Sequence, residues 1–358
     1  MAKTVLTFGP QHVVFPEPIQ FKLKVEDEFV VGAEPVIGYV HRGIEKAFEL
    51  NELKKNIFLA ERICGICQSP HSNAYVLGVE RLMGIEAPPR AKYIRVIMNE
   101  MNRLHSHMLW FGLLGDAIGF ESYFMQVWNY REKLMDIIEK IAGNRVTYSM
   151  NAIGGVRRDI SDEQAKEIHN VMDFLEEAFK SIEEVLKDYT LIKRTKGIGV
   201  LTESEAKRDG AVGPTARASN VPYDMRMLGY DAYRDLEFKP VVVDSCDSYG
   251  RAVVRWKEML QSINLIREAL SKMPVGDIIT KSNALPKGET VIRVEPPRGE
   301  LFYYLKGNGT KNLERVKVRT PTFANIWPTI TMLSKGCEFA NVPVVVLSID
   351  PCISCTER

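Results

Sequence analysis

The 358-residue sequence predicts an α+β fold that is mainly helical, with a central helical bundle and small β-sheets near the N-terminal and C-terminal parts. Two observations support this prediction. Apolar residues recur at helical spacing through the middle of the chain, and short β-favouring segments stand near both ends. We expect three segments packed as one unit: an N-terminal α+β lobe (1–45), a helical core (46–275) and a C-terminal α+β segment (276–358).

Local patterns predict the elements in chain order. Strands are expected over 4–8 and 19–25, where Gly9-Pro10 and Pro16 punctuate β-favouring residues. Helices are expected from residue 44 into the first cysteine pair and over 91–114, 121–142, 161–189 and 249–273. Ser161, followed by Gln164, has the spacing of a capping box. The tail should return to strands over 290–295, 301–306 and 316–318, before a short helix over 324–333.

Composition excludes several classes of protein. Apolar residues make up 45% of the chain and charged residues 26%, as in an ordinary folded protein. The net charge of +1 gives no general attraction to nucleic acid, and no nucleic-acid partner is expected. No apolar run reaches the roughly 18 residues of a membrane span, and no signal pattern opens the chain. Of six cysteines, Cys246 and Cys337 stand alone and are expected to be buried apolar residues.

The other four cysteines form two Cys-x-x-Cys pairs, Cys64 with Cys67 and Cys352 with Cys355. Four thiolates from such distant segments can form a metal site only after the whole chain has folded. A structural zinc ion is a common occupant of four thiolates. Soft thiolates also suit nickel and low-valent iron, and an Fe–S cluster is a further alternative, although its ligands usually lie in one compact run. Spacing alone leaves the metal open.

The residues around both pairs form longer motifs, RICGICQSPH at 62–71 and DPCISCTER at 350–358. They resemble the large subunit of [NiFe] hydrogenases, whose signatures are R-x-C-G-x-C-x-x-x-H and D-P-C-x-x-C. The final Arg358 is similar to the energy-converting, membrane-bound group (Ech-type and CO-linked), where uptake enzymes have His. Further similar segments are GPQH (9–12), EPI (17–19), HRGIE (41–45), PRG (297–299) and PT (321–322). The resemblance implies the large-subunit fold of that family.

The resemblance also implies a Ni–Fe centre whose iron carries CO and two cyanides. All four thiolates would bind nickel, with Cys64 and Cys352 as terminal ligands and Cys67 and Cys355 bridging to iron. A terminal thiolate is the more basic kind, so Cys352 would accept the proton when H₂ splits. Glu17 would pass protons to and from it.

Other residues would surround the centre. Arg298, beside Pro297, would stand over the open metal position and polarise or orient H₂. Asp350 would brace the second pair and Arg298, Thr322 would donate a hydrogen bond to a cyanide, and His71 would donate one to a bridging thiolate. Taken without the resemblance, Arg298 and Glu17 are typical of surface positions.

Near the C-terminus the resemblance leaves two roles open for Glu45. It would either help to hold a second metal, Mg²⁺ or Fe²⁺, or act structurally by pairing with Arg42 or Arg358.

Two departures from the family also stand out. Ser106 lies between His105 and His107 where uptake enzymes have an aspartate, so a carboxylate partner for Arg298 must come from elsewhere or is missing. In the loop after GPQH, Val13 replaces the usual proline.

We therefore expect the catalytic subunit of a hydrogenase that reduces protons reversibly with electrons from a low-potential donor, ferredoxin. No cysteines remain for an electron relay, so the implied partners are a small subunit with a [4Fe–4S] cluster, a ferredoxin-like Fe–S subunit and membrane subunits that move ions. The subunit would lie peripherally on the cytoplasmic side of the cell membrane. The family's precursors carry a C-terminal extension that is removed after nickel insertion. If the gene encodes such an extension, a chain stopping at Arg358 is the processed form; if the gene ends at Arg358, maturation must proceed without that cleavage.

Two other functions are weighed against this one. The first is a non-catalytic quinone-binding or coupling subunit like that of respiratory complex I, which shares the GPQH and HRGxE segments but has lost the cysteines. The second is a structural zinc protein.

Overall fold

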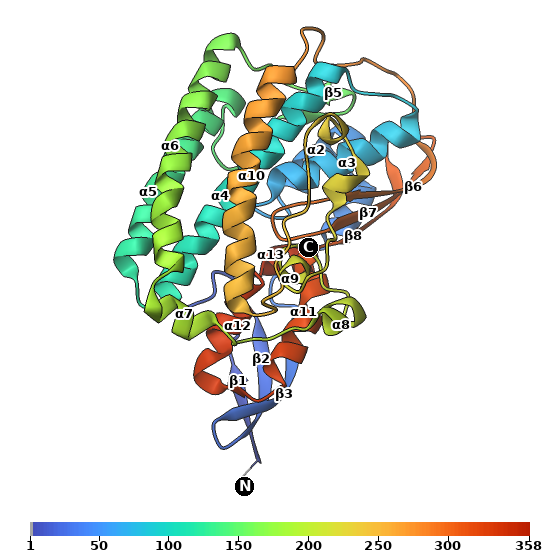
Figure 1. Ribbon diagram of the computed structural model, residues 1–358. Coiled ribbons are helices and arrows are strands. Elements are labelled where there is room, and N and C mark those ends of the chain that lie inside the picture. Colours follow the sequence, from blue (N-terminus) through green and yellow to red (C-terminus); the bar gives the residue numbers. More distant parts are fainter. Residues whose placement is uncertain (1–2) are drawn as a thin grey trace.

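The computed structural model describes residues 3–358 and shows a body of long helices with one small sheet at its base and another at its side (Figure 1). This confirms the predicted α+β, mainly helical class. In the described part of the chain no helix is both long and apolar enough to cross a membrane.

Four long helices form the bundle: α4 (Pro89–Ala117), α5 (Glu121–Ala142), α6 (Asp162–Leu186) and α10 (Ser248–Lys272). Their ends follow sequence signals. The Ser161 hydroxyl accepts the Gln164 amide at 3.2 Å in the predicted capping box, and Gly143, at φ 78°, ends α5. The helix expected to reach residue 189 stops at Leu186 instead, because Asp188 caps the separate helix α7 (Tyr189–Thr195).

The sheet at the base joins both ends of the chain. Its antiparallel strand order is β1 (Lys3–Phe8), β2 (Gln20–Glu26), β3 (Phe29–Val36) and β9 (Cys337–Glu338). Phe21, Leu23 and Val25 alternate along β2 toward one buried face. There they meet apolar residues of α11 (Pro321–Leu333) and α12 (Val342–Ser348) in a shared core.

The second sheet is the antiparallel meander β6 (Lys287–Val294), β7 (Leu301–Asn308) and β8 (Leu313–Arg319). It packs against α1 (Ile44–Leu50) and α3 (Gln68–Met83), and α2 (Leu53–Glu61) packs on α3 within the same apolar core. Gly78 lets α3 lie close to the sheet, because a Cβ there would stand 2.5 Å from Leu305 Cδ1. Shorter elements complete the fold: β4 (Asn151–Ala152), β5 (Gly155–Val156), α8 (Glu203–Arg208), α9 (Gly213–Arg217), η1 (Met225–Leu228), η2 (Tyr233–Asp235), η3 (Phe339–Asn341) and α13 (Ile353–Glu357).

Two local expectations are wrong. The helix predicted to run into the first cysteine pair ends at Glu61, and the pair lies in the turn before α3. The turn is favoured there because the Cys67 amide donates to Cys64 Sγ at 3.4 Å. Cys246 and Cys337 are half-buried rather than buried, since the first lies in a turn at φ 61° and the second on the short edge strand β9.

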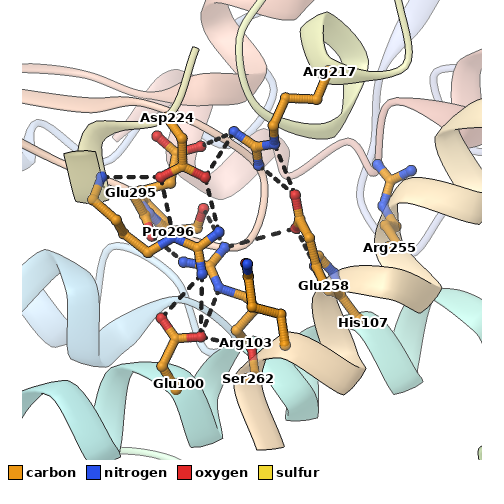
Figure 2. A network of polar contacts seen from close by, with 12 residues as sticks. Glu100, Arg103, His107, Arg217, Asp224, Arg255, Glu258, Ser262, Glu295 and Pro296 are labelled. Atoms are coloured by element: carbon orange, nitrogen blue, oxygen red, sulfur yellow. Dashed lines mark hydrogen bonds and ion pairs between the residues drawn. The ribbon is translucent and has the colours of Figure 1, made fainter. Parts of the chain in front are cut away.

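A buried ionic network joins α4, α9, α10 and the loop after β6 (Figure 2). Its ion-paired members are each at most 2% exposed: Glu100, Arg103, Arg217, Asp224, Arg226, Glu258 and Glu295. Glu100 pairs with Arg103 at 3.2 Å and Arg226 at 3.3 Å. It also accepts the hydroxyls of Ser262 at 2.6 Å and Tyr233 at 2.5 Å. Burial alone would raise the pKa of Glu100, but the two arginines outweigh it and lower the pKa to about 2.

Glu100→Gln should destabilise the protein by about 3 kcal/mol at neutral pH, because it leaves two buried guanidinium groups short of one counter-charge. The folded-state pKa lies below the unfolded value of about 4.3, so this stabilisation is present above that pH and is lost as the pH falls toward 2. Urea unfolding followed by circular dichroism measures it. The exposed Glu177→Gln, which breaks a surface pair with Lys180, is the control. Equal stability of the two variants would contradict the role given to Glu100.

Candidate metal centre

The two cysteine pairs, far apart in sequence, meet at one buried point. Cys64 Sγ lies 3.3 Å from Cys352 Sγ, and Cys67 Sγ lies 3.3 Å from Cys355 Sγ. The sulfur atoms of Cys64, Cys67 and Cys355 are all within 4.8 Å of one another. Each of the four residues is at most 3% exposed. We call these four side chains the thiol cluster.

Each pair is presented by a turn at the start of a helix. Cys67 is the N-cap residue of α3, and Cys352 is that of α13. Arg42 holds the two turns together, because its guanidinium donates to the carbonyls of Arg62 and Ile63 at 2.8 Å and to that of Ser354 at 3.0 Å. The sequence reasoning considered Arg42 only as a partner of Glu45. Its place in the HRGIE segment is the sole signal of its importance.

The four thiol groups lie so close together that each affects how readily the others ionise. Hydrogen bonds from Cys352, Cys355 and Cys64 hold the pKa of Cys67 well below its usual range. Burial and the neighbouring thiols raise the pKa of Cys355 well above it. A thiolate is the metal-binding form, and a soft cation between the sulfur atoms would allow all four to ionise. The donor set therefore fits a thiophilic metal such as nickel, iron or zinc.

Arg298 lies beside the thiol cluster and is 3% exposed, unlike the surface position typical of its residue type. Its Nε donates to the Asp350 carbonyl and its Nη2 to Asp350 Oδ1, both at 2.8 Å. Burial opposes its charge, but Asp350 and the sulfur atoms of Cys352, Cys64 and Cys67 raise the pKa of Arg298 well above its ordinary value. Among residues 3–358, Arg298 Nη1 and Asp350 Oδ2 have no hydrogen-bond partner.

The loop that carries Arg298 is fixed by contact between two glycines. A Cβ at Gly213, in α9, would lie 2.3 Å from the Arg298 carbonyl oxygen, and a Cβ at Gly299 would lie 2.6 Å from the Gly213 amide nitrogen. Both glycines have positive φ, 65° and 123°. Backbone therefore packs directly on backbone, with Pro297 buried beside it, and this sets the position of the guanidinium.

The expected aspartate position on α4 holds a small side chain. Ser106 is fully buried and its Oγ has no hydrogen-bond partner among the described residues. The following His107 turns toward Glu258, 3.0 Å from its Nε2, and burial lowers the pKa of His107 to about 4. Asp350 therefore supplies the carboxylate that pairs with Arg298. His105 is buried and accepts Arg131 Nε at 2.9 Å.

Beside Cys355, His71 Nε2 lies 3.5 Å from Cys355 Sγ, and its Nδ1 lies 2.8 Å from the Tyr303 hydroxyl. Tyr303 orients the ring in the way that outer residues orient metal-binding side chains. Sequence reasoning missed Tyr303, because an alternating apolar strand gives no sign that one member carries a functional hydroxyl.

Two side chains, Thr322 and Glu17, hold the turn of Cys352. The Cys352 amide donates to Thr322 Oγ1 at 3.1 Å, so the Thr322 hydroxyl keeps its own proton for another acceptor. The half-buried Glu17 accepts the amides of Ile353 and Ser354, the second at 3.0 Å. Glu17 therefore lies at the two residues that follow Cys352.

Glu45 pairs with Arg358 rather than Arg42. Its carboxylate accepts Arg358 Nε at 3.1 Å and the Val318 amide at 3.0 Å, and it lies 3.3 Å from Lys317 Nζ and 3.7 Å from Arg315 Nη2. Burial would raise the pKa of Glu45, but the Val318 amide and Arg358 lower it. A carboxylate already facing three cationic side chains does not suit Mg²⁺ or Fe²⁺. The structural role of Glu45 is the one that these residues fit.

Comparisons with known proteins agree with this geometry. A family described as the respiratory-chain NADH dehydrogenase 49 Kd subunit matches residues 117–285 and 277–358, and a family described as nickel-dependent hydrogenase matches residues 42–120. The chain is 40% identical to the carbon monoxide-induced hydrogenase of Rhodospirillum rubrum, covering 100% of both chains. It is also 40% identical to the membrane-bound hydrogenase subunit alpha of Pyrococcus furiosus, covering 99% of this chain and 87% of that protein.

A solved structure has the same fold. A chain of the membrane-bound sulfane sulfur reductase, an archaeal respiratory membrane complex, superposes with a TM-score of 0.94 at 30% identity, covering 99% of this chain and 98% of that one. Because full-length relatives and family models agree with the motifs around the thiol cluster, the chain belongs to the family of energy-converting [NiFe] hydrogenase large subunits, which is homologous to the 49-kDa subunit of respiratory complex I.

Proposed function

We propose that this chain is the catalytic subunit of a membrane-associated [NiFe] hydrogenase, which interconverts protons and H₂ with electrons from a low-potential donor, ferredoxin. The observation that carries the proposal is the convergence of four buried thiols from two distant segments beside a buried arginine. Similarity to proteins named hydrogenases over nearly the whole chain supports it.

In this proposal Cys64 and Cys352 would bind nickel, and Cys67 and Cys355 would bind both nickel and an iron that carries CO and two cyanides. Such a centre, when bound, polarises H₂ for heterolytic cleavage. The chain supplies unused donors beside it: the Thr322 hydroxyl and Arg298 Nη1 are suited to hydrogen-bond the cyanide nitrogens.

Side chains of this chain then stabilise negative charge and transfer protons. Arg298, held by Asp350, places a permanent positive charge beside electron-rich sulfur atoms. Cys352 accepts and releases the proton, and Glu17 carries it onward from the adjacent turn. Glu17 is half-buried, so it stands between the enclosed cluster and the surface.

Electrons must come from a partner, because the two remaining cysteines are single and lie outside the thiol cluster. We propose a small subunit with a [4Fe–4S] cluster, a ferredoxin-like Fe–S subunit, and membrane subunits that couple turnover to ion movement. The relatives named as membrane-bound complexes support this assembly. We place the subunit peripherally on the cytoplasmic side of the membrane.

A second function, a non-catalytic coupling or quinone-binding subunit, is favoured by the match to the 49 Kd subunit family. The thiol cluster argues against it, since such a role needs no set of four metal-binding side chains. A structural zinc site would use the cysteines, but it gives no role to the buried Arg298 or to Glu17.

Infrared spectroscopy of the purified complex tests the proposed function. We expect stretching bands of CO and cyanide, together with one nickel per copy of this chain and iron in excess of nickel by elemental analysis, because the Fe–S clusters of the partner subunits also contain iron. Zinc without nickel and without these bands would support the structural site instead, and the absence of both nickel and zinc would support the coupling subunit.

Cys352→Ser should abolish H₂ evolution and lower nickel content, because a serine hydroxyl is a poor ligand for a soft metal. Cys337→Ser, at a half-buried cysteine outside the thiol cluster, is the matched control and should retain both. H₂ production by a nickel-loaded Cys352→Ser protein would remove the role assigned to this thiol.

Glu17→Gln should keep the metal content and slow H/D exchange at least about 10²-fold. The glutamine side chain can still accept hydrogen bonds from the backbone N–H groups of Ile353 and Ser354, but it cannot carry a proton. Glu17→Ala separates the two roles, since it also removes the hydrogen bonds and should lower metal retention. An exchange rate in Glu17→Gln equal to that of the wild type would place the proton route elsewhere.

A further inference from the structure

The buried ionic network carries more negative than positive charge. Its ion pairs connect three arginines, Arg103, Arg217 and Arg226, with four carboxylates, Glu100, Asp224, Glu258 and Glu295. Three positive charges against four negative charges leave one negative charge in excess. His107 does not supply the missing charge, because burial lowers its pKa to about 4 and leaves it neutral near pH 7.

A fourth arginine, Arg255, stands apart from these pairs in Figure 2. It stacks on Trp110 with its guanidinium carbon 4.2 Å from the ring centre and donates to the Arg251 carbonyl at 3.0 Å. The carboxylate that acts on its charge most strongly is Asp350, on the side of the thiol cluster. Glu258 also acts on the charge of Arg255, but in the described part of the chain Arg255 forms no ion pair with any of the four carboxylates.

Glu295 is the carboxylate with the fewest positive partners. Each of Glu100, Asp224 and Glu258 contacts two arginines, whereas Glu295 contacts only Arg217, at 2.7 Å, in the described part of the chain. The same nitrogen, Arg217 Nη1, also lies 3.1 Å from Asp224 Oδ2. Two carboxylates thus share one guanidinium nitrogen inside the protein, and an uncompensated charge there is costly unless a proton neutralises it.

We propose that Glu295 and Asp224 form an internal proton-binding site, in which the pair holds one proton at neutral pH and Glu295 is its main carrier. When two carboxylates share one site, their like charges repel each other and one of them keeps a proton. The proton brings the network to three positive and three negative charges. The site is separate from the thiol cluster and from the proton route through Glu17.

The surroundings of Glu295 agree with this assignment. Burial, and then the charge of Asp224, raise the pKa of Glu295 to about 7, against the opposing effect of Arg217 and the Met225 amide. The titratable and charged groups that face the pair are Glu100 and Arg103 from α4, Arg217 from α9, Arg226 from η1, Glu258 from α10, and the hydroxyls of Tyr230 and Tyr233. Since the two carboxyl groups titrate together, the apparent pKa belongs to the pair.

The site has a link to solvent on one side. Arg217 Nη1 also donates to the Tyr223 carbonyl at 2.9 Å, and the Tyr223 hydroxyl donates to Glu300 at 3.1 Å. Tyr223 and Glu300 line a surface pocket with Arg293 and Arg319. Tyr223 therefore connects the guanidinium shared by the two carboxylates with the residues of this pocket.

On the other side the site lies next to the metal centre. Glu295 precedes Arg298 by three residues in one loop, and Arg103 fixes this loop through the carbonyls of Glu295 at 2.6 Å and Pro296 at 3.3 Å. A more negative metal centre would therefore favour the protonated pair by electrostatic repulsion. This coupling, unlike the proton site itself, rests on the proposed function.

The test is a pH titration of the full complex by infrared difference spectroscopy in the carbonyl-stretch region of protonated carboxyl groups. We expect a band in the wild type with a midpoint near neutral pH. Glu295→Gln should remove it. Asp224→Asn, which brings the remaining network to three positive and three negative charges, should shift the midpoint to acid pH by more than about one unit. Glu49→Gln, at a carboxylate paired with Lys46 and Arg315, should leave the band unchanged.

The proposal is overturned if the wild type has no carboxyl band that titrates near neutrality, or if the band persists unshifted in both Glu295→Gln and Asp224→Asn. If one variant fails to fold, the other decides. The coupling is tested separately, by repeating the wild-type titration with the centre oxidised and reduced. Reduction should shift the midpoint to higher pH, and equal midpoints would overturn the coupling. Missing CO and cyanide bands would mark failure of the proposed function, whereas the titration in that same sample still tests the proton site.

Discussion

The structure depends on bringing four sulfur atoms from two distant turns to within contact of one another. Such a site closes a loop of most of the chain, and loop closure costs conformational entropy that a packed core must offset. The fold meets this demand with contacts between the ends. β9 pairs with β3, and Arg42 donates to carbonyls of both cysteine turns. The thiol cluster is therefore a property of the whole molecule, although its ligands occupy few positions.

Electrostatics sets the second requirement. Several sulfur atoms that must ionise together in a dry interior need nearby positive charge, and the fold places Arg298 beside them with Asp350 to hold it. Arg255, whose charge is influenced by Asp350 and Arg298, and the ionic network between α4 and α10 extend the same polar interior.

The sequence was informative where local signals decide the outcome and much less so where distant residues meet. The bundle helices, the Ser161 cap and the strands of the second sheet follow from periodicity and capping, which neighbours in sequence determine. The ligands were found because cysteine spacing and flanking residues are distinctive. Arg42 and Tyr303 were not, since their roles arise only when β7 and the HRGIE segment meet the cysteine turns. The excess charge at Glu295 was likewise invisible, because its partners lie on α9, η1 and their flanks.

The contacts of α13 carry a consequence for how such a centre can be assembled. Glu17, Arg42 and Glu45 each bind this last helical turn or the residue after it, and Glu357 in turn accepts the amides of Gly38 and Val40. The N-terminal segment thus holds in place the turn that bears two of the four thiols. Cys64 and Cys67 lie on a turn of their own, to which only Arg42 among these residues is bound. Enclosure of all four sulfur atoms therefore depends on the first 45 residues of the chain as well as on the two turns that carry the cysteines.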